Sequence, residues 1–195
     1  MIPPVFGGTL TAEAIGICPR EAALRLGCPA DTVAIAEDCL SELKKAVLCR
    51  YAYCRLPIAH PREGVTDLGF GELASRDLEK NLVNFQEAFL LAVTLGAGVD
   101  RLLLRLSRLS PARHFVTDAL ASALAEAACD RAEAIATQGI PCRPRYSPGY
   151  GDLPLAVQKP LLTTLDAPRR CGITIGDALI MSPSKSITAI IGILP

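Results

Sequence analysis

The sequence predicts an α+β fold whose strands pair in an antiparallel manner, and three observations support this. Segments with helical periodicity alternate only loosely with apolar, strand-like runs, which does not fit the regular alternation of a parallel α/β sheet. Two apolar runs near the C-terminus flank a turn-like "SPSK" segment, which favours a hairpin. The chain has 195 residues, half of them hydrophobic, so it is long enough for one good core or two small ones.

The chain divides by its patterns into an N-terminal helical segment, residues 1–58, and a core, residues 59–195. We expect the two to form one compact domain. The elements predicted up to residue 137 are, in order, two short helices over 11–27, a helix over 31–47, an extended segment over 51–58, a loop over 59–71, a helix over 72–88, a buried strand over 88–96, a helix over 96–110 and a long helix over 111–137.

Local signals set the boundaries of these elements. Thr11 and Asp31 are N-cap candidates for the first helices, and Pro19 divides the 11–27 segment. Ser75 is a possible cap inside the 72–88 segment, just before Asp77. The longest helix starts at a proline and ends before a glycine, the usual order of these two residues at helix ends.

A polar residue recurs every fourth position on the longest helix and forms one slowly drifting stripe. The stripe is typical of a solvated helix face, and we interpret most of it so. Its members are His114, Asp118, Ser122, Glu126 and Asp130.

The segment "RYSPGYGDLPL", residues 145–155, is too rich in Pro and Gly for a helix or strand and is longer than a simple turn. It predicts a rigid, shaped loop. A short helix over 153–166 follows, interrupted by Pro160. The remaining apolar runs cover residues 173–175, 178–181 and 187–193, and the last two are predicted to pair as a hairpin.

The bulk composition excludes several classes of function. Basic and acidic residues balance at 20 each, so there is no basic field for nucleic acid. The most apolar run is about 12 residues long, whereas a membrane-spanning helix needs about 20. The N-terminus lacks the pattern of a signal peptide. We therefore expect a cytoplasmic protein that binds neither nucleic acid nor membrane.

Eight cysteines are present, but none forms a CxxC pair and no histidine lies at finger-like spacing from any of them. We interpret them as small buried hydrophobes and predict no metal site. Cys142 lies close to the 145–155 loop, so a small enzyme with a cysteine nucleophile is one alternative. Cys142 has no histidine nearby in the sequence and belongs to no recognisable motif. We therefore predict no catalytic residue.

Several pieces of the C-terminal half, taken in order, resemble the activation (reactivation) domain of cobalamin-dependent methionine synthase, in particular its small stand-alone relatives. The first piece is the Arg-x-x-Pro-Gly-Tyr loop, here "RYSPGY". Downstream, the matching residues are Leu165, Asp166, Gly172, Asp177, Met181, Pro183, Ser186 and Thr188. The Ala-rich stretch "DALASALAEAACD" also resembles a helix of the family that carries a glutamate where this chain has Glu126.

The resemblance implies both a fold and a function. The fold is a twisted antiparallel sheet with flanking helices. The family's domain binds S-adenosylmethionine and presents its methyl group to the cobalamin of the synthase during reactivation of cob(II)alamin. A separate chain would do this for a methionine synthase, or another corrinoid protein, that holds the cobalamin. A flavodoxin- or ferredoxin-type protein would supply the electron. The chain would then be part of a methyltransferase system rather than a stand-alone enzyme.

The candidate S-adenosylmethionine contacts are Arg145, Tyr150, Glu126, Pro148 and Gly149. A guanidinium suits the carboxylate of the ligand, and a glutamate suits its ammonium group. The Pro-Gly step lets the backbone approach a ligand in one fixed shape. Where the family has aromatic residues near the chain end, this chain has Ile190 and Ile191. That departure favours a second hypothesis, a non-catalytic docking module for a corrinoid protein that does not bind S-adenosylmethionine.

Overall fold

The computed structural model describes residues 3–18, 22, 24, 27, 33 and 35–195. The predicted helix break at Pro19 and the predicted N-cap at Asp31 lie outside the described residues, as does Cys28. Thr11 caps α1 (Ala12–Ile15), because its hydroxyl accepts a hydrogen bond from the Ala14 amide.

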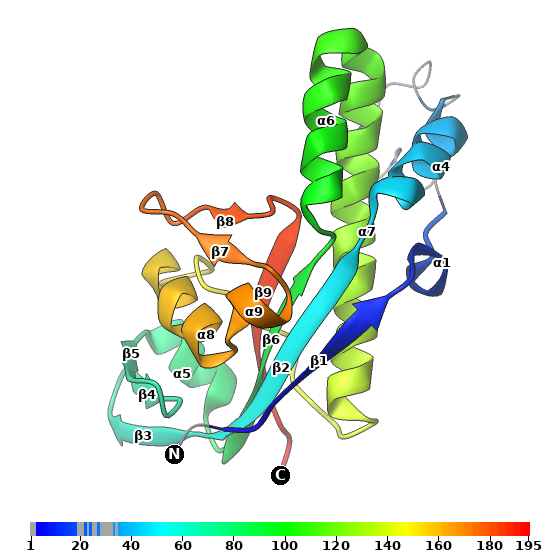
Figure 1. Ribbon diagram of the computed structural model, residues 1–195. Helices are drawn as coiled ribbons and strands as arrows, with labels where there is room; N and C mark the ends of the chain where they lie inside the picture. Colours follow the sequence, from blue (N-terminus) through cyan, green and yellow to red (C-terminus); the bar gives the residue numbers. More distant parts are fainter. Residues whose placement is uncertain (1–2, 19–21, 23, 25–26, 28–32, 34) are drawn as a thin grey trace.

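A four-stranded antiparallel sheet forms the centre of the molecule (Figure 1). Its strands are β1 (Val5–Leu10), β2 (Cys49–Pro57), β6 (Glu87–Thr94) and β9 (Ser186–Gly192), in the order β1-β2-β6-β9. The predicted α+β class, with antiparallel strands and flanking helices, is confirmed.

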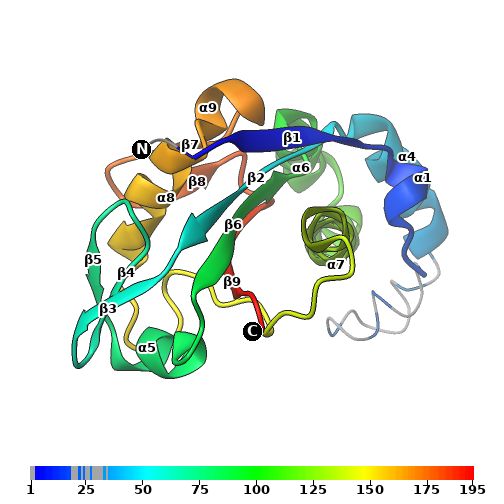
Figure 2. The same cartoon turned by 90° about the horizontal axis from the view of Figure 1, so that it is seen from below.

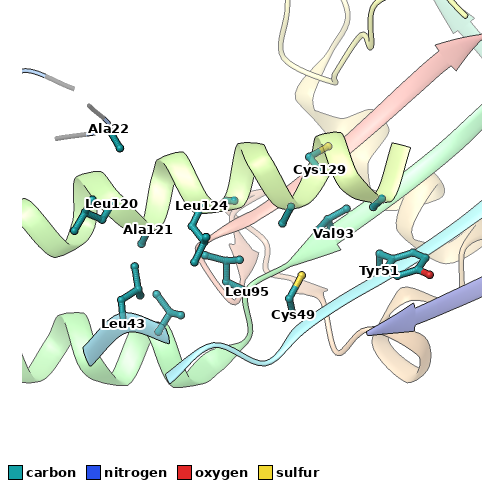
Figure 3. Packing of buried hydrophobic residues seen from close by; sticks show 14 of the residues in the cluster. Ala22, Leu43, Cys49, Tyr51, Val93, Leu95, Leu120, Ala121, Leu124 and Cys129 are labelled. Carbon is teal, nitrogen blue, oxygen red and sulfur yellow. The ribbon is translucent and has the colours of Figure 1, made fainter. Parts of the chain in front are cut away.

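The long helix α7 (Pro111–Thr137) packs on one face of this sheet, and α4 (Ala36–Ala46) and α6 (Ala97–Leu109) pack against α7 and each other. Alternate strand residues, among them Leu91 and Val93, point into this layer, where they pack with buried leucines and alanines of the helices (Figure 3). The α6 and α7 segments are confirmed almost to the residue. Both have long local patterns and clear end signals, including Ser110, whose hydroxyl caps α7.

Shorter elements cover the opposite face (Figure 2). They are α5 (Arg76–Leu82), the 3-10 turn Leu155–Val157, α8 (Gln158–Thr164) and α9 (Ala167–Arg170), with two small sheets. Leu90 and Ile190 of the central sheet point into this second core. Because both faces are buried, β6 is apolar from residue 88 to residue 93, and its prediction as a buried strand is confirmed.

The small sheets differ from the prediction for residues 59–74. The expected loop contains β3 (Ala59–Arg62) and β4 (Val65–Asp67), and β5 (Glu72–Ala74) replaces the first turn of the expected helix. The glycine that indicated a loop, Gly64, lies in the tight turn between β3 and β4 with a φ of +75°. Ser75 does cap a helix, since its hydroxyl accepts from the Leu78 amide at 3.0 Å.

The predicted C-terminal hairpin is wrong. Strand β8 (Met181–Ser182) pairs with β7 (Thr174–Ile175), whereas β9 crosses to the central sheet and pairs with β6. The intervening residues are held by distant groups: the Ser184 amide donates to the Asp100 carboxylate at 3.0 Å, and Lys185 forms an ion pair with Asp118 at 2.8 Å. These non-local contacts direct the chain away from its sequence neighbour.

Two further differences have local causes. Pro160 does not interrupt α8, because it lies in the first helical turn, where a backbone N–H has no intrahelical partner. Residues 1–58, predicted to be mainly helical, also contribute β1 to the central sheet, whereas the extended segment predicted over 51–58 is confirmed as part of β2. β1 is an edge strand with two glycines and mostly exposed residues, so it lacks the alternation that marks a strand. How the chain divides into domains stays a prediction.

Candidate functional site

A cleft of about 440 Å³ lies along the β9 edge of the central sheet. The loop 145–150 forms one wall, and α7, α8, β8 and β9 contribute the rest. Its lining residues are Glu126, Arg145, Tyr146, Ser147, Pro148, Tyr150, Gln158, Met181, Ser186, Ile187 and Thr188.

The loop is fixed to the sheet by backbone hydrogen bonds. The amide of Tyr146 donates to the Ile190 carbonyl and the amide of Ile190 donates to the Tyr146 carbonyl, both at 2.8 Å. Within the loop, the Gly149 amide donates to Leu153 at 2.9 Å, and the Tyr146 hydroxyl donates to the Tyr150 carbonyl at 3.0 Å. The rigid, shaped loop predicted from the sequence is therefore an extension of the β9 edge, closed on itself by its own backbone.

A second anchor ties the loop to the N-terminus of α5. The Asp152 carboxylate accepts from the Ser75 hydroxyl, from the Arg76 amide at 2.9 Å and from the Asp77 amide at 3.2 Å. These hydrogen bonds, led by the one from Ser75, lower the pKa of Asp152 below its ordinary value. The carboxylate satisfies amides that the start of a helix leaves unpaired, and it holds the loop in place.

Gly151 is required at the point where the loop approaches α5. Its φ is +52°, and a Cβ at this position would lie 2.5 Å from the Asp77 carboxylate and 2.6 Å from the Tyr146 hydroxyl. Gly149 also has a positive φ, of +93°. The glycines thus allow a backbone course that a residue with a side chain would strain.

Arg145 lies at the centre of a cluster with three carboxylates on α7. Its Nη1 donates to Asp130 at 2.5 Å and to Glu133 at 3.1 Å, and its Nη2 donates to Glu126 at 2.8 Å. The Arg145 side chain is 25% exposed, against 62% for Glu126 and 68% for Asp130. Burial opposes the charged form of the guanidinium, but the hydrogen bonds that it donates to the carboxylates outweigh this effect and raise the pKa of Arg145.

The cluster leaves an excess of two negative charges beside the cleft, since one guanidinium faces three carboxylates. It also leaves Arg145 with donors to spare. A guanidinium carries five N–H groups, and three are used by the carboxylates. The arrangement suits a ligand that is cationic overall and also carries a carboxylate.

Four of the five candidate contacts predicted from the sequence line this cleft: Glu126, Arg145, Pro148 and Tyr150. The fifth, Gly149, connects Pro148 to Tyr150 but is not among the lining residues. Pro148 is buried, whereas Tyr150 is 67% exposed with its ring 6.4 Å from that of Tyr146. The structure brings the predicted residues together; whether they bind a ligand stays a prediction.

The contacts predicted from the sequence did not include several residues of the site, among them Glu133, Gln158 and Met181. Glu133 lies one turn beyond Asp130 on α7, so helical spacing from the polar stripe was a usable signal for it. Gln158 comes from α8, and no local pattern connects it to the loop. Met181 of β8 is among the residues that carry the family resemblance, but it was not assigned to the site. The stripe itself is half-exposed but not free of partners, since Asp118 pairs with Lys185 and Asp130 pairs with Arg145.

The prediction that the cysteines are small buried residues is confirmed for five of the seven that the structure describes and is wrong for Cys18, which is exposed. Cys39, Cys49, Cys54, Cys129 and Cys171 are buried, and burial raises the pKa of Cys129 to about 12. Cys142, the nucleophile of the alternative enzyme hypothesis, is half-buried, and burial followed by the charge of Glu133 raises its pKa as well. Such a thiol stays protonated and is a poor nucleophile.

Within the described ranges, no three His, Cys, Asp or Glu side chains gather closely enough to hold a metal ion. No helix in the part of the chain that the structure describes is long and apolar enough to span a membrane.

Comparison with known proteins identifies the fold. No protein-family model matches the sequence, and no curated protein matches it significantly. Among solved structures, the chain is similar to the MetH reactivation domain in its crystal structure bound to AdoHcy, with a TM-score of 0.69 and 15% sequence identity. The match covers 99% of this chain and 79% of the other. The chain therefore has the fold of that reactivation domain, as the sequence resemblance predicted.

Proposed function

We propose that this protein binds S-adenosylmethionine in the cleft beside Arg145 and supports the reductive methylation of cob(II)alamin on a partner protein. The partner is a cobalamin-dependent methionine synthase or a related corrinoid protein. The observation that carries the proposal is the acid-rich Arg145 cluster in a cleft on a fold whose solved relative is bound to AdoHcy.

The charges of the ligand correspond to the groups of the cleft. S-adenosylmethionine carries a carboxylate, an ammonium and a sulfonium, so it is cationic overall. The N–H groups of Arg145 that the carboxylates leave available suit the ligand carboxylate, because a guanidinium binds a carboxylate through paired donors. The excess negative charge of Glu126 and its neighbours stabilises the ammonium and sulfonium groups. S-adenosylhomocysteine lacks the sulfonium charge and is expected to gain less from these carboxylates.

The loop supports binding and presentation by staying in one conformation. Its hydrogen bonds to Ile190 and to the start of α5 fix Pro148 and Tyr150 before any ligand arrives, which lowers the entropy lost on binding. The exposed ring of Tyr150 lies at the mouth of the cleft. We place the corrin of the partner against this ring.

The chemistry of methyl transfer needs no acid, base or nucleophile from this chain. The partner's corrin, reduced by one electron from the reductant, would supply the nucleophile, and this chain would hold S-adenosylmethionine in place and retain S-adenosylhomocysteine as the product. Within the described residues the cleft offers no nucleophile paired with a base, which agrees with a binding and orienting role.

The experiment is a methylation assay on a corrinoid protein in its cob(II)alamin state. The mixture contains S-adenosylmethionine with a labelled methyl group and a flavodoxin- or ferredoxin-type reductant, with and without this protein. We expect label to enter the corrin only when the protein is present, to be lost with Arg145→Ala and to be kept with Arg105→Ala. Equal labelling without the protein would reject the proposal.

One observation favours the docking-module alternative. Ile190 and Ile191 are buried in the central sheet, so the end of the chain places no aromatic side chain in the cleft. A docking module would associate with a corrinoid protein in a pull-down but show no thermal shift with S-adenosylmethionine. A clear thermal shift would eliminate this alternative.

A further inference from the structure

Gln158 is a buried polar side chain in the cleft wall whose carboxamide oxygen has no hydrogen-bond partner. It is the first residue of α8 and is 7% exposed. Buried polar groups are nearly always paired, because an unpaired one loses its hydrogen bonds to water without replacement. An exception in the wall of a cleft indicates a partner that comes from outside the chain.

The residues beside Gln158 in the chain are apolar, so the segment would also accommodate an apolar residue at this position. Val157, Leu161 and Leu162, its neighbours in and before α8, are all buried in the second core. A methionine of similar length would pack in this place without an unpaired oxygen. The carboxamide therefore costs stability in the free protein, which is typical of a group kept for binding.

The position of Gln158 divides the cleft into a charged end and a neutral end. Glu126 and Arg145 come from α7 and the loop after it, whereas Gln158 and Met181 come from α8 and β8. Figures 1 and 2 show α7 and α8 on opposite sides of β9. A ligand whose charged amino-acid part lies at Arg145 would extend its neutral part toward Gln158.

We propose that Gln158 recognises the nucleobase: its carboxamide accepts a hydrogen bond from the exocyclic amine of adenine and donates one to the adjacent ring nitrogen. This assignment rests on the proposed function. A carboxamide presents an acceptor and a donor side by side, which matches this edge of adenine. The oxygen is covered in the free protein, so the side chain turns toward the cleft as the base enters.

The test is a titration of wild type and Gln158→Met with S-adenosylhomocysteine and with its purine analogue that lacks the 6-amino group. Wild type should bind the analogue about tenfold more weakly than S-adenosylhomocysteine, the usual effect of one lost hydrogen bond. Gln158→Met should bind both ligands equally and at least as weakly as wild type binds the analogue, because the variant loses both proposed hydrogen bonds. The melting temperature of the free variant should stay level or rise by about 2–4 °C, because the unpaired oxygen is gone.

Asn81 supplies a matched control. Its side-chain oxygen is also buried without a partner, but Asn81 lies on α5 and does not line the cleft. Asn81→Leu should leave the affinity for both ligands unchanged.

The outcomes separate this assignment from the proposed function. If wild type binds S-adenosylhomocysteine and Gln158→Met binds it equally well, the assignment is overturned and the proposed function stands. If the variant loses the same factor for both ligands, the carboxamide contacts the ribose, and the nucleobase assignment is wrong. A large fall in the melting temperature of the free variant would show a structural role instead. Failure of wild type to bind would overturn the proposed function and this assignment together.

Discussion

Two clusters of arginine and carboxylate side chains lie along α7, and their compositions are opposite. At the cleft, one arginine, Arg145, pairs with three carboxylates. Near the start of α7, one carboxylate, Glu42 of α4, pairs with two arginines, Arg105 and Arg113. A second cleft of about 510 Å³ lies beside this other cluster and is lined by Lys45 and Arg101 as well.

The difference shows how similar ion pairs give the two ends of one helix different binding properties. Excess negative charge at Arg145 attracts a cation, whereas excess positive charge at Glu42 repels one. The two ends also differ in backbone. The Arg145 cluster is joined to a loop fixed by hydrogen bonds, and the Glu42 cluster lies between regular helices. Matched substitutions at the two ends therefore separate binding from stability.

The largest expected effect is that of Arg145→Ala compared with Arg105→Ala. Removal of Arg145 leaves three like charges close together, and we expect a loss of about 2–3 kcal/mol in the free energy of unfolding, less than for a fully buried pair because Glu126 and Asp130 are exposed. Affinity for S-adenosylmethionine should fall about 10- to 100-fold.

The control is Arg105→Ala. Arg105 is more than half exposed, so its removal should cost at most about 1 kcal/mol in the free energy of unfolding and leave affinity unchanged. Urea unfolding and calorimetric titration give both quantities, and equal effects of the two variants on affinity would contradict the assignment of the cleft.

The next effect concerns a glycine in each region. Gly151→Ala should destabilise by about 1–2 kcal/mol through its left-handed backbone and should displace the loop, lowering ligand affinity. Gly98 of α6 lies against the Ala46 carbonyl, so Gly98→Ala should destabilise by about 1–3 kcal/mol. It should leave affinity unchanged, because its close contact is with α4, and neither Gly98 nor Ala46 lines the cleft. An affinity loss for Gly98→Ala as large as that for Gly151→Ala would mean that global stability, not loop shape, controls binding.

A smaller effect is expected from removing one negative charge at each end. Glu126→Gln should weaken S-adenosylmethionine binding by about 0.2–1 kcal/mol, the usual range for an exposed ion pair, and should reduce the dependence of affinity on salt. S-adenosylhomocysteine, without the sulfonium charge, should be affected less. Glu42→Gln serves as the control and should change neither affinity. Titrations at low and high salt measure the effect, and equal losses for the two ligands would remove the electrostatic explanation.

The smallest expected effect is on the pH dependence of stability, through the Asp152 carboxylate that anchors the loop to α5. The pKa of Asp152 is lowered in the folded state, first by the Ser75 hydroxyl, so its charged form contributes stability above the ordinary aspartate pKa of 3.8. That contribution is lost as the pH falls through the lower folded-state pKa. Asp152→Asn should therefore be less stable than wild type at neutral pH, and the difference should narrow below about pH 3.8. A difference that stays constant over this range, measured by urea unfolding, would show that the anchor does not depend on charge.

The same two regions show what the sequence could predict. Helices α6 and α7 were predicted almost to the residue because their periodicity and end signals are local. The loop was predicted as rigid from its Pro and Gly residues, and the family resemblance selected four residues that do line the cleft. The features of the fold and the cleft that the sequence did not predict depend on contacts between distant parts of the chain. The pairing of β9 with β6 joins residues from 92 (Thr94 and Ser186) to 104 (Ala88 and Gly192) positions apart, and the anchor from Asp152 to the Arg76 amide of α5 spans 76. Gln158 meets the loop and α7 only in the folded cleft, so no short window of sequence contains these contacts.

Calorimetric titration of the purified protein with S-adenosylhomocysteine tests the central claim most directly, because it asks only whether the cleft beside Arg145 binds this class of ligand. We predict saturable binding of one ligand per chain, weakened by Arg145→Ala and unchanged by Arg105→Ala. If no heat of binding is seen at high ligand concentration, alone and again with a corrinoid protein present, the cleft does not bind this ligand and the account is wrong.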